Sequence, residues 1–446
     1  MNDVGGKLDE AIEAPVRLHV EPYVSKAYAR EEKDKLWSKV WQLACREEEI
    51  PNPGDYYTYD ILDQSFIVLR AEDGGIVAHH NVCRHRGKRL TSGTGHVSHL
   101  HCGYHGWQWN LRGENIRVLN KEHWCGGLDK VDLSLASVKV GRWGGYVYIN
   151  LDPDCEPLEE FLAPVIDVIG PLDLGGMRYK WRKWLRYPAN WKVVTEAFIE
   201  GYHAPATHPQ TAKFGTGVTA GSAEGIHAKM WAVGVEGGGI GTGIGATSTH
   251  KPKDLPFLGI QQAAETVWAN YSETLLEAAR LTAQALPESA TPAEVGADLM
   301  RRAHAIDAAR GVEWPEVAPE HMARVGINWH VFPNQVILPN LTFALGFRVR
   351  PDGFDPNSCI TEIYALERYP DGLEPKTEWV ESPDITSKEQ WPLLLRQDFR
   401  QMHEIQQGMV SGSIEYMYPN PLQEAGVVNF QRNLADYMGC CAPEVL

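Results

Sequence analysis

Residues 83–107 read CRHRGKRLTSGTGHVSHLHCGYHGW and contain two short segments in which a cysteine and a histidine occur together. In the first segment one residue separates Cys83 from His85, and in the second segment two residues separate Cys102 from His105. Glycines at positions 87, 103 and 106 allow a tight backbone in both segments. Two such loops can close around one compact metal centre, to which each loop gives one thiolate and one imidazole.

The mixture of ligand types distinguishes between two kinds of metal centre. In a Rieske [2Fe–2S] cluster two thiolates hold one iron and two imidazoles hold the other, and a C-x-H loop with a C-x-x-H loop supplies that set. A Cys2His2 zinc site is the alternative, but zinc modules usually pair like ligands, as C-x2–4-C with H-x3–5-H. The sequence therefore predicts a Rieske cluster held by Cys83, His85, Cys102 and His105.

The segments around these loops are typical of a small antiparallel β domain, which we expect over residues 41–155. Short runs with strand character are separated by turn residues, and they cover residues 56–59, 65–69, 76–81, 99–110 and 145–151. Residues 1–40 are predicted as an N-terminal helical arm, and residues 156–177 as a linker.

The rest of the chain, residues 178–446, is predicted as a second domain of α+β class, in which helices pack on one face of an antiparallel sheet. Its expected strands cover residues 331–338, 341–349 and 360–366, and its expected helices cover residues 191–202, 260–286, 292–310 and 388–410. The third helix begins with a capping box from Thr291 to Glu294. The glycine-rich stretch 215–245 lacks a G-x-G-x-x-G match, so we interpret it as a mobile loop near an active-site entrance and not as a phosphate loop.

A second set of possible metal ligands lies in residues 190–209, NWKVVTEAFIEGYHAPATHP. Glu196, Glu200 and His203 are spaced as residues that share one helix face, and Pro205 is expected to end that helix. The following turn could bring His208 beside His203. With a carboxylate from elsewhere, two imidazoles would form the 2-His-1-carboxylate set of Fe(II) oxygenases; satisfied core histidines are the alternative.

At this point the sequence resembles the α subunits of Rieske non-haem iron oxygenases, the aromatic-ring-hydroxylating dioxygenases. The resemblance rests on Cys-Arg-His-Arg-Gly, on Cys-Gly-Tyr-His-Gly-Trp, and on Asn-Trp-Lys followed by Tyr-His-x4-His. It implies a Rieske [2Fe–2S] cluster, a mononuclear Fe(II) and a helix-grip-like catalytic domain. By this likeness His203 and His208 are iron ligands and Asn190 lies close to the metal. Residues 397–408 resemble the late helix that carries the third ligand, which implies Asp398, with His403 and Glu404 as competing candidates.

Glu200 is a departure from the family, most of which has Asp three residues before the first histidine ligand. In the family that carboxylate bonds an iron-ligand histidine and a Rieske histidine of the neighbouring subunit, and so forms the route for electrons. Glutamate can bind both groups with one more methylene, and branches that oxidise quaternary ammonium compounds resemble this sequence in having it. The resemblance also implies a head-to-tail homotrimer, with or without a small β subunit.

The reaction that the resemblance implies is insertion of oxygen from O2 into a small organic substrate, with NAD(P)H-derived electrons from a reductase or ferredoxin. We expect hydroxylation of an aromatic or other bulky apolar ring. The alternatives are N- or O-demethylation, oxidation of a quaternary ammonium compound and, more remotely, electron transfer without oxygenase chemistry.

Composition limits the other functions. A formal net charge of −16 argues against non-specific binding of nucleic acid or anionic membranes, since both require a positive surface. The N-terminal residues carry no secretory pattern, and no run approaches the roughly 18 apolar residues of a membrane span. The eight cysteines are not expected to form a disulfide framework. The expected location is the cytoplasm.

Overall fold

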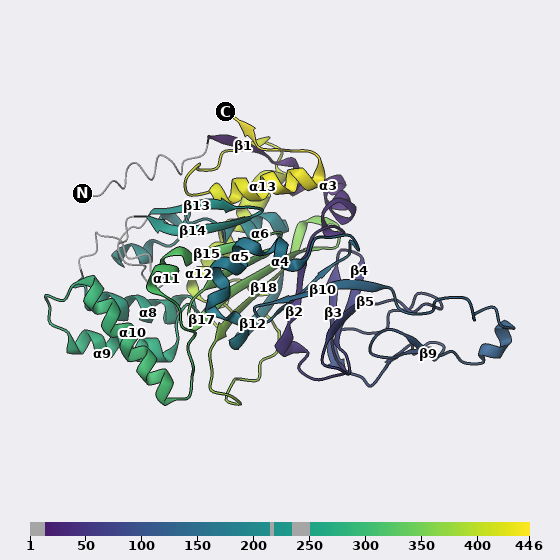
Figure 1. Cartoon of the computed structure of the whole chain (residues 1–446). Coiled ribbons are helices and arrows are strands. Elements are labelled where there is room, and N and C mark those ends of the chain that lie inside the picture. Colours follow the sequence, from purple (N-terminus) through teal and green to yellow (C-terminus); the bar gives the residue numbers. More distant parts are fainter. Residues whose placement is uncertain (1–13, 215–217, 234–249) are drawn as a thin grey trace. The chain divides into compact units, whose positions relative to one another are not determined.

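The computed structural model describes residues 14–214, 218–233 and 250–446, and the chain divides into two compact units (Figure 1). The small unit runs from Glu32 to Phe161, and the large unit combines the segment before Glu32 with Leu162–Leu446. The N-terminal arm predicted as helical over residues 1–40 is interrupted at Ser25: α2 (Glu21–Val24) is followed by α3 (Lys26–Glu32) and the π-helical turn η1 (Lys33–Trp37). The segment predicted as a linker contains α4 (Leu158–Phe161) and α5 (Ala163–Ile169).

The small unit is built on a seven-stranded antiparallel sheet in the order β2-β11-β10-β5-β4-β3-β6. Along β3 the side chains alternate between half-buried and buried, as in a sheet with one covered face. A second, three-stranded sheet, β7-β8-β9, adjoins the cluster loops. The strands are β2 (Gln42–Arg46), β3 (Asp55–Ile61), β4 (Gln64–Arg70), β5 (Ile76–His80), β6 (Thr94–His96), β7 (Leu100–His101), β8 (Gln108–Trp109), β9 (Asn115–Arg117), β10 (Ser137–Trp143) and β11 (Tyr146–Asn150).

The expected single strand over residues 99–110 is wrong. The chain forms β7 and then leaves the sheet at Cys102, and it re-enters as β8 only at Gln108. The intervening loop folds back on itself because the N–H of Cys102 donates to the carbonyl of Trp107.

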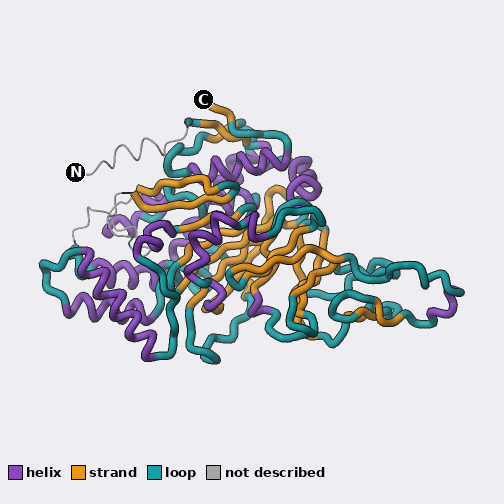
Figure 2. Tube along the Cα trace, viewed as in Figure 1, coloured by secondary structure: helices purple, strands orange, loops and turns teal. Residues whose placement is uncertain are grey.

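The large unit contains an eight-stranded sheet in the order β13-β14-β15-β16-β17-β18-β12-β19, antiparallel except for the edge pair β12 and β19. Figure 2 shows its strands with helices packed against them, and α6 contacts β17 and β18 while α13 contacts β13 and β14. The predicted α+β class is therefore confirmed. The strands are β12 (Arg178–Tyr187), β13 (Val218–Glu224), β14 (His227–Val233), β15 (Asn328–Val331), β16 (Gln335–Pro339), β17 (Phe343–Asp352), β18 (Asp355–Glu367) and β19 (Val380–Glu381).

Three more strands of the large unit join the two ends of the chain, because β1 (Val16–His19) pairs with both β20 (Tyr416–Met417) and β21 (Glu444–Val445). The helices are α6 (Trp191–Ala197), α7 (Ala204–Thr207), α8 (Leu255–Thr266), α9 (Glu273–Ala285), α10 (Pro292–Ala309), α11 (Pro319–Val325), α12 (Leu393–Val410) and α13 (Ala425–Met438).

Several element predictions for this unit need correction. The helix over 260–286 is two helices, because Trp268 and Asn270 have positive φ and Ser272 begins α9 as its N-cap. The strand over 331–338 is the β15–β16 hairpin. The capping box from Thr291 to Glu294 at the start of α10 is confirmed. Of the glycine-rich stretch 215–245, residues 215–217 and 234–245 lie outside the described residues, and its described part forms β13 and β14.

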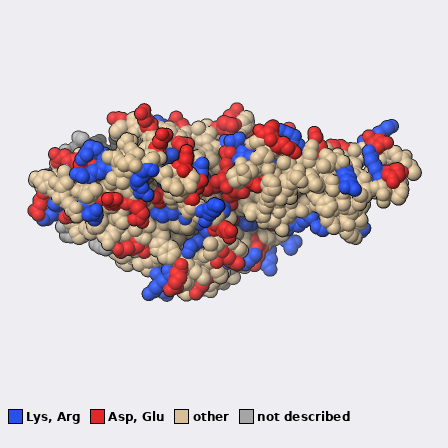
Figure 3. Space-filling view, turned by 90° about the horizontal axis from the view of Figure 1, so that it is seen from below, with Lys and Arg blue, Asp and Glu red and all other residues tan. Residues whose placement is uncertain are grey.

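In the parts of the chain that the structure describes, no helix combines the length and the apolar character needed to cross a bilayer. On the face shown in Figure 3, Lys and Arg side chains are interspersed with Asp and Glu. That face therefore offers no continuous basic surface to a nucleic acid.

Candidate metal centres

The two cluster loops of the small unit have the same backbone design. In the first loop the N–H of Cys83 donates to the carbonyl of Lys88, and Gly87 donates back to Cys83. In the second, Cys102 and Gly106 repeat the pattern, with Cys102 donating to the carbonyl of Trp107. Gly87 and Gly106 have φ of +78° and +71°, a conformation that costs glycine little. The two loops therefore present their side chains in equivalent ways.

The side chains divide into an inner and an outer pair. The thiols of Cys83 and Cys102 are buried and lie within hydrogen-bonding reach of each other. The rings of His85 and His105 are half-buried, with centroids 4.6 Å apart. His85 stacks on Trp107, and its buried Nδ1 has no protein partner. Two inward thiols and two outward imidazoles, one with an unpartnered ring nitrogen, fit a Rieske [2Fe–2S] cluster with one thiolate and one imidazole from each loop.

Backbone N–H groups surround the two sulfurs. Those of His85 and Arg86 point at the Cys83 sulfur, and those of Tyr104 and His105 point at the Cys102 sulfur. Burial raises the pKa of the Cys83 thiol, and these N–H groups oppose that shift. Such donors stabilise thiolate and influence the reduction potential of a bound cluster.

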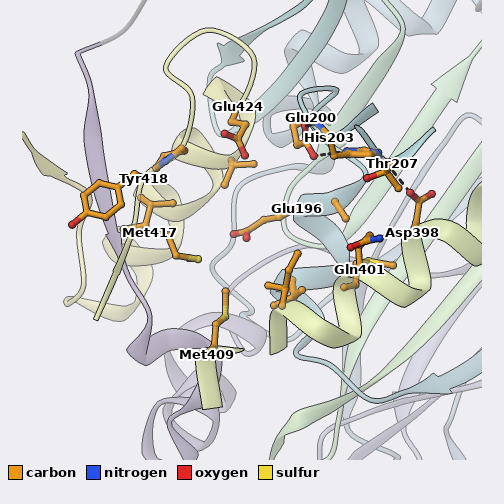
Figure 4. A pocket seen from close by; sticks show the side chains of 17 residues that line it. Glu196, Glu200, His203, Thr207, Asp398, Gln401, Met409, Met417, Tyr418 and Glu424 are labelled. Atoms are coloured by element: carbon orange, nitrogen blue, oxygen red, sulfur yellow. Dashed lines mark hydrogen bonds and ion pairs between the residues drawn. The ribbon is translucent and has the colours of Figure 1, made fainter. Parts of the chain in front are cut away.

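In the large unit, His203, His208 and Asp398 offer ligand atoms that all lie within 4.8 Å of one another. The Nε2 atom of His208 lies 2.9 Å from Oδ1 of Asp398, and the Nε2 atom of His203 lies 3.6 Å from the same oxygen. Two ligands that bind one metal at neighbouring positions are themselves ~3 Å apart, given metal–ligand bonds of ~2 Å. The three residues therefore fit as ligands of one metal ion. Figure 4 shows His203 and Asp398 from this group.

Each histidine of this group is held by its other ring nitrogen. Nδ1 of His203 lies 2.5 Å from Oε1 of Glu200, and Nδ1 of His208 lies 2.9 Å from Oε1 of Gln397. When Nδ1–H donates to these oxygens, Nε2 keeps its lone pair for a metal. Burial alone would lower the pKa of His203, but the hydrogen bond and the negative charge of Glu200 raise it above its usual value.

The local backbone that positions Glu200 differs from the predicted helix. Helix α6 ends at Ala197, so Glu200 and His203 lie in a turn and not on a helix face. In that turn the Glu200 carboxylate accepts hydrogen bonds from the backbone N–H groups of Tyr202 and His203. Pro205 does not end a helix but lies in the first turn of α7. His203 and His208 nevertheless come together as predicted, with their ring centroids 5.3 Å apart.

The other residues named from the sequence make contacts of their own. Asn190 is the N-cap of α6, and its side-chain amide donates to the backbone carbonyls of Tyr23 and Pro356. It is not among the three grouped ligands. Of the competing candidates, His403 contacts the carbonyl of Pro188, and Glu404 is exposed beside Arg400.

A cavity of about 210 Å³ borders the metal group, and its lining includes residues to which the sequence analysis gave no role at the site. His203, Asp398 and Glu200 line it, together with two further glutamates, Glu196 and Glu424. Figure 4 shows Glu196 between the side formed by Met417 and Tyr418 and the side formed by His203 and Asp398. The helical spacing of Glu196 and Glu200 in the sequence partly indicates that Glu196 lies near the site, whereas nothing in the sequence indicates this for Glu424.

Two known families match this chain, one over each of its predicted domains. The Rieske [2Fe–2S] domain family matches residues 40–124, and the catalytic domain of the ring-hydroxylating alpha subunit family matches residues 174–440. Because the second match covers more than half of the chain, this protein belongs to the ring-hydroxylating α-subunit family. Its expected cofactors are accordingly a Rieske [2Fe–2S] cluster and a mononuclear iron.

Individual relatives include several oxygenase subunits. The chain is 32% identical to the carnitine monooxygenase oxygenase subunit of Acinetobacter pittii, over 42% of this chain and 51% of that protein. It is 34% identical to the glycine betaine monooxygenase oxygenase subunit of Pseudomonas aeruginosa, over 40% and 42% of the two chains. The large oxygenase component of a Ralstonia salicylate 5-hydroxylase is 33% identical over 42% and 48%. The matches thus span about half the length of these relatives.

Solved structures share the fold over almost the whole chain. A quaternary ammonium Rieske monooxygenase bound to L-carnitine superimposes with a TM-score of 0.64, 18% identity and 97% coverage of both chains. Naphthalene 1,2-dioxygenase bound to indole gives a TM-score of 0.64 at 18% identity, covering 96% and 93%. At such identities the likeness concerns the fold alone.

Proposed function

We propose that this chain is the oxygenase subunit of a Rieske-type monooxygenase that inserts one oxygen atom of O2 into a small quaternary ammonium compound. The observation that carries the proposal is the group of His203, His208 and Asp398, with Glu200 on the outer nitrogen of His203. A 2-His-1-carboxylate set leaves coordination positions open, and iron held in this way binds and activates O2. Electrons come from a reductase or ferredoxin.

Two observations favour a cationic substrate. The relatives at 30% identity or more include oxygenase subunits named for carnitine and for glycine betaine. In addition, the branches of the family that oxidise quaternary ammonium compounds resemble this sequence in having glutamate at the position of Glu200. An aromatic substrate is the second candidate, supported by the salicylate 5-hydroxylase component and by the fold of naphthalene dioxygenase. Methionines, aliphatic side chains and carboxylates together line the cavity beside the metal group.

The chain's own residues prepare the site for this reaction. Glu200 and Gln397 orient the two imidazoles, so that the metal ligands need little rearrangement on metal binding. Asp398 is 8% exposed and supplies the negative charge close to both rings.

The test of substrate class is product analysis with reconstituted protein, a chemical or enzymatic reductant and a panel that includes carnitine, glycine betaine, salicylate and naphthalene. We expect oxygen-dependent consumption of a quaternary ammonium compound. Hydroxylation of the aromatic compounds alone would favour the second candidate, and an iron-loaded chain that oxidises none of them would contradict the proposed substrates.

We further propose that copies of the chain assemble head to tail as a trimer, so that the cluster of one copy serves the mononuclear iron of the next. The loop that carries Cys83 and His85 exposes Arg84, Arg86 and Lys88, and the metal group of the large unit has Glu200 and Glu424 beside it. One similar solved structure is described as revealing inter-subunit electron transfer in that protein.

Co-expression of two inactive variants tests this arrangement. Cys102→Ser removes a cluster ligand and Asp398→Ala removes an iron ligand, so neither variant should turn over alone. Mixed oligomers should regain part of the activity, because a cluster from one variant can face an iron from the other. Absence of any regained activity in purified mixed oligomers would contradict the head-to-tail arrangement.

A further inference from the structure

Glu196 is an acidic group at the wall of the cavity that neither metal centre uses. It lies in the last turn of α6, and the residues around it in the cavity include the metal-group residues His203 and Asp398. Protein surrounds its carboxyl group, which keeps accessible surface only because it borders the cavity. This position makes Glu196 a candidate for a chemical task at the metal group.

The carboxyl is held by one of its two oxygens. The hydroxyl of Tyr23, from α2, donates to Oε1 over 2.7 Å, and the side-chain amide of Gln431, from α13, donates to the same oxygen over 2.6 Å. Because both donors bind Oε1, Oε2 is the oxygen available to the cavity. A fixed carboxyl with one oxygen open to water can take up or release a proton without moving its backbone.

Burial of the carboxyl keeps this proton available near neutral pH. Burial raises the pKa of Glu196 to about 7, the hydrogen bonds from Tyr23 and Gln431 and the charge of Lys192 oppose that rise, and the negative charge of Glu424 adds to it. The pKa of Glu424 is itself raised by burial and by the charge of Glu200. General acids act best when their pKa lies close to the working pH.

A purely structural role would not need an acid here. Glutamine has the same shape and an Oε1 that accepts both hydrogen bonds, and it avoids the cost of a buried charge. The cavity of about 210 Å³ is large enough for several water molecules, since each occupies about 30 Å³ in the liquid. Water can thus connect the carboxyl to the metal group.

The proposed reaction requires such a proton source, and the inference therefore rests on the proposed function. Monooxygenation converts C–H, O2, two electrons and two protons to C–OH and water. The O–O bond breaks, one oxygen enters the C–H bond and the other leaves as water. The two electrons come from the reductase or ferredoxin, while both protons must reach the metal group from the protein or solvent. We propose that Glu196 is a proton-transfer residue that delivers a proton through the cavity to the metal group during oxygen insertion.

The first part of the test uses the metal-free protein, so that its result does not depend on catalysis. Infrared difference spectra between about pH 5.5 and about pH 8.5 should show a carboxylic acid band that disappears near neutral pH. This band should be absent from Glu196→Gln and present in Glu374→Gln, the matched change at an exposed glutamate. Glu424→Gln should retain the Glu196 band with a lower midpoint, since it removes a neighbouring negative charge. A band that persists unchanged in Glu196→Gln would overturn the proposal.

The second part measures a single turnover of chemically reduced protein with the quaternary ammonium compound that the substrate panel identifies. Glu196→Gln should keep its iron content and cluster absorbance but form product about 10²-fold more slowly, the lower end of typical general-acid effects. The wild-type rate should fall as the pH rises through neutrality, and this dependence should vanish in Glu196→Gln and remain in Glu374→Gln. A wild-type rate and pH profile in Glu196→Gln would overturn the proposal.

The two parts separate this inference from the proposed function. If the wild-type chain turned over no substrate, the proposed function and the use of the proton would both be rejected, while the infrared spectra would still show whether Glu196 holds one. If the wild type turned over the substrate and Glu196→Gln showed the same rate and pH profile, the inference would fail and the proposed function would stand.

Discussion

Replacing Glu196 by glutamine should make the stability of the large unit less dependent on pH. The pKa of Glu196 is raised from an ordinary 4.5 to about 7 in the folded chain, because burial disfavours its charge. A group with a raised pKa stabilises the folded state fully below its unfolded pKa, and this contribution is lost as the pH rises through the folded pKa. Glutamine keeps both hydrogen bonds from Tyr23 and Gln431 but cannot ionise, so the variant should not show the loss.

The expected size follows from the two pKa values. At 1.36 kcal/mol for each tenfold change in proton affinity, the interval between 4.5 and about 7 corresponds to about 3 kcal/mol. Because the carboxyl borders a cavity that water can enter, we expect about 2 kcal/mol. An unfolding entropy of about 2 cal/mol/K per residue over about 300 residues converts this to a rise in Tm of about 3 °C.

Differential scanning calorimetry of the metal-free proteins, from about pH 5 to about pH 8.5, measures this effect. The wild type and Glu196→Gln should melt together at the acidic end and diverge as the pH rises, with the variant melting higher above neutral pH. The other titratable groups are common to both chains, so the difference isolates Glu196. A Tm difference that stays constant across the range would refute the argument from burial.

Three further predictions concern the metal centres. Asp398→Ala should lose the mononuclear iron and keep the cluster absorbance, whereas Glu404→Ala should keep both; unchanged iron in Asp398→Ala would show that the third ligand is another residue. Gln397→Leu should weaken iron binding about 10- to 100-fold, the usual cost of losing a group that orients a ligand, as measured by competition with a chelator, and wild-type affinity would exclude that role. Glu200→Ala should retain both metals yet slow electron transfer from the reduced cluster, followed by stopped-flow absorbance, and normal transfer would remove Glu200 from the route.

The cluster loops and the two histidines of the metal group could be predicted because their geometry is local. Cys83 with His85, and Cys102 with His105, are each brought together by a turn that a glycine permits. His203 and His208 are five positions apart and meet across the short helix α7. Asp398 is 190 positions from His208, so only the resemblance to a known family pointed to it.

The supporting residues could not be predicted because their partners are remote in sequence. Tyr23 and Gln431 lie 173 and 235 positions from Glu196. No periodic pattern in the sequence predicts that α2 and α13 both contact the Glu196 carboxyl. Gln397 was adjacent to a predicted ligand, but its contact with His208 spans 189 positions.

The early end of α6 also depends on contacts that the sequence pattern hides. Residues 191–202 have helical spacing throughout, yet the helix ends at Ala197. Phe198 stacks on Phe347 of β17 at 4.1 Å, and the side-chain amide of Asn328 donates to the Phe198 carbonyl. The bond from Asn328 occupies a carbonyl that a continuing helix would use, and the stacking holds Phe198 against the sheet, a tertiary effect that overrides local propensity.

That early end of the helix is what allows Glu200 to hold His203. In a continuous helix the N–H groups of Tyr202 and His203 would donate to carbonyls one turn earlier. In the observed turn both donate to the Glu200 carboxylate, which also meets the His203 ring. One carboxylate thereby fixes the backbone and the imidazole together, and Nε2 is directed toward Asp398.

Glu200→Gln should test this double role, because an amide keeps one accepting oxygen but loses the charge that raises the pKa of His203. The ring should then lose its proton at lower pH in the metal-free protein, which NMR titration of His203 can follow; an unchanged pKa would mean that Glu200 does not control this histidine.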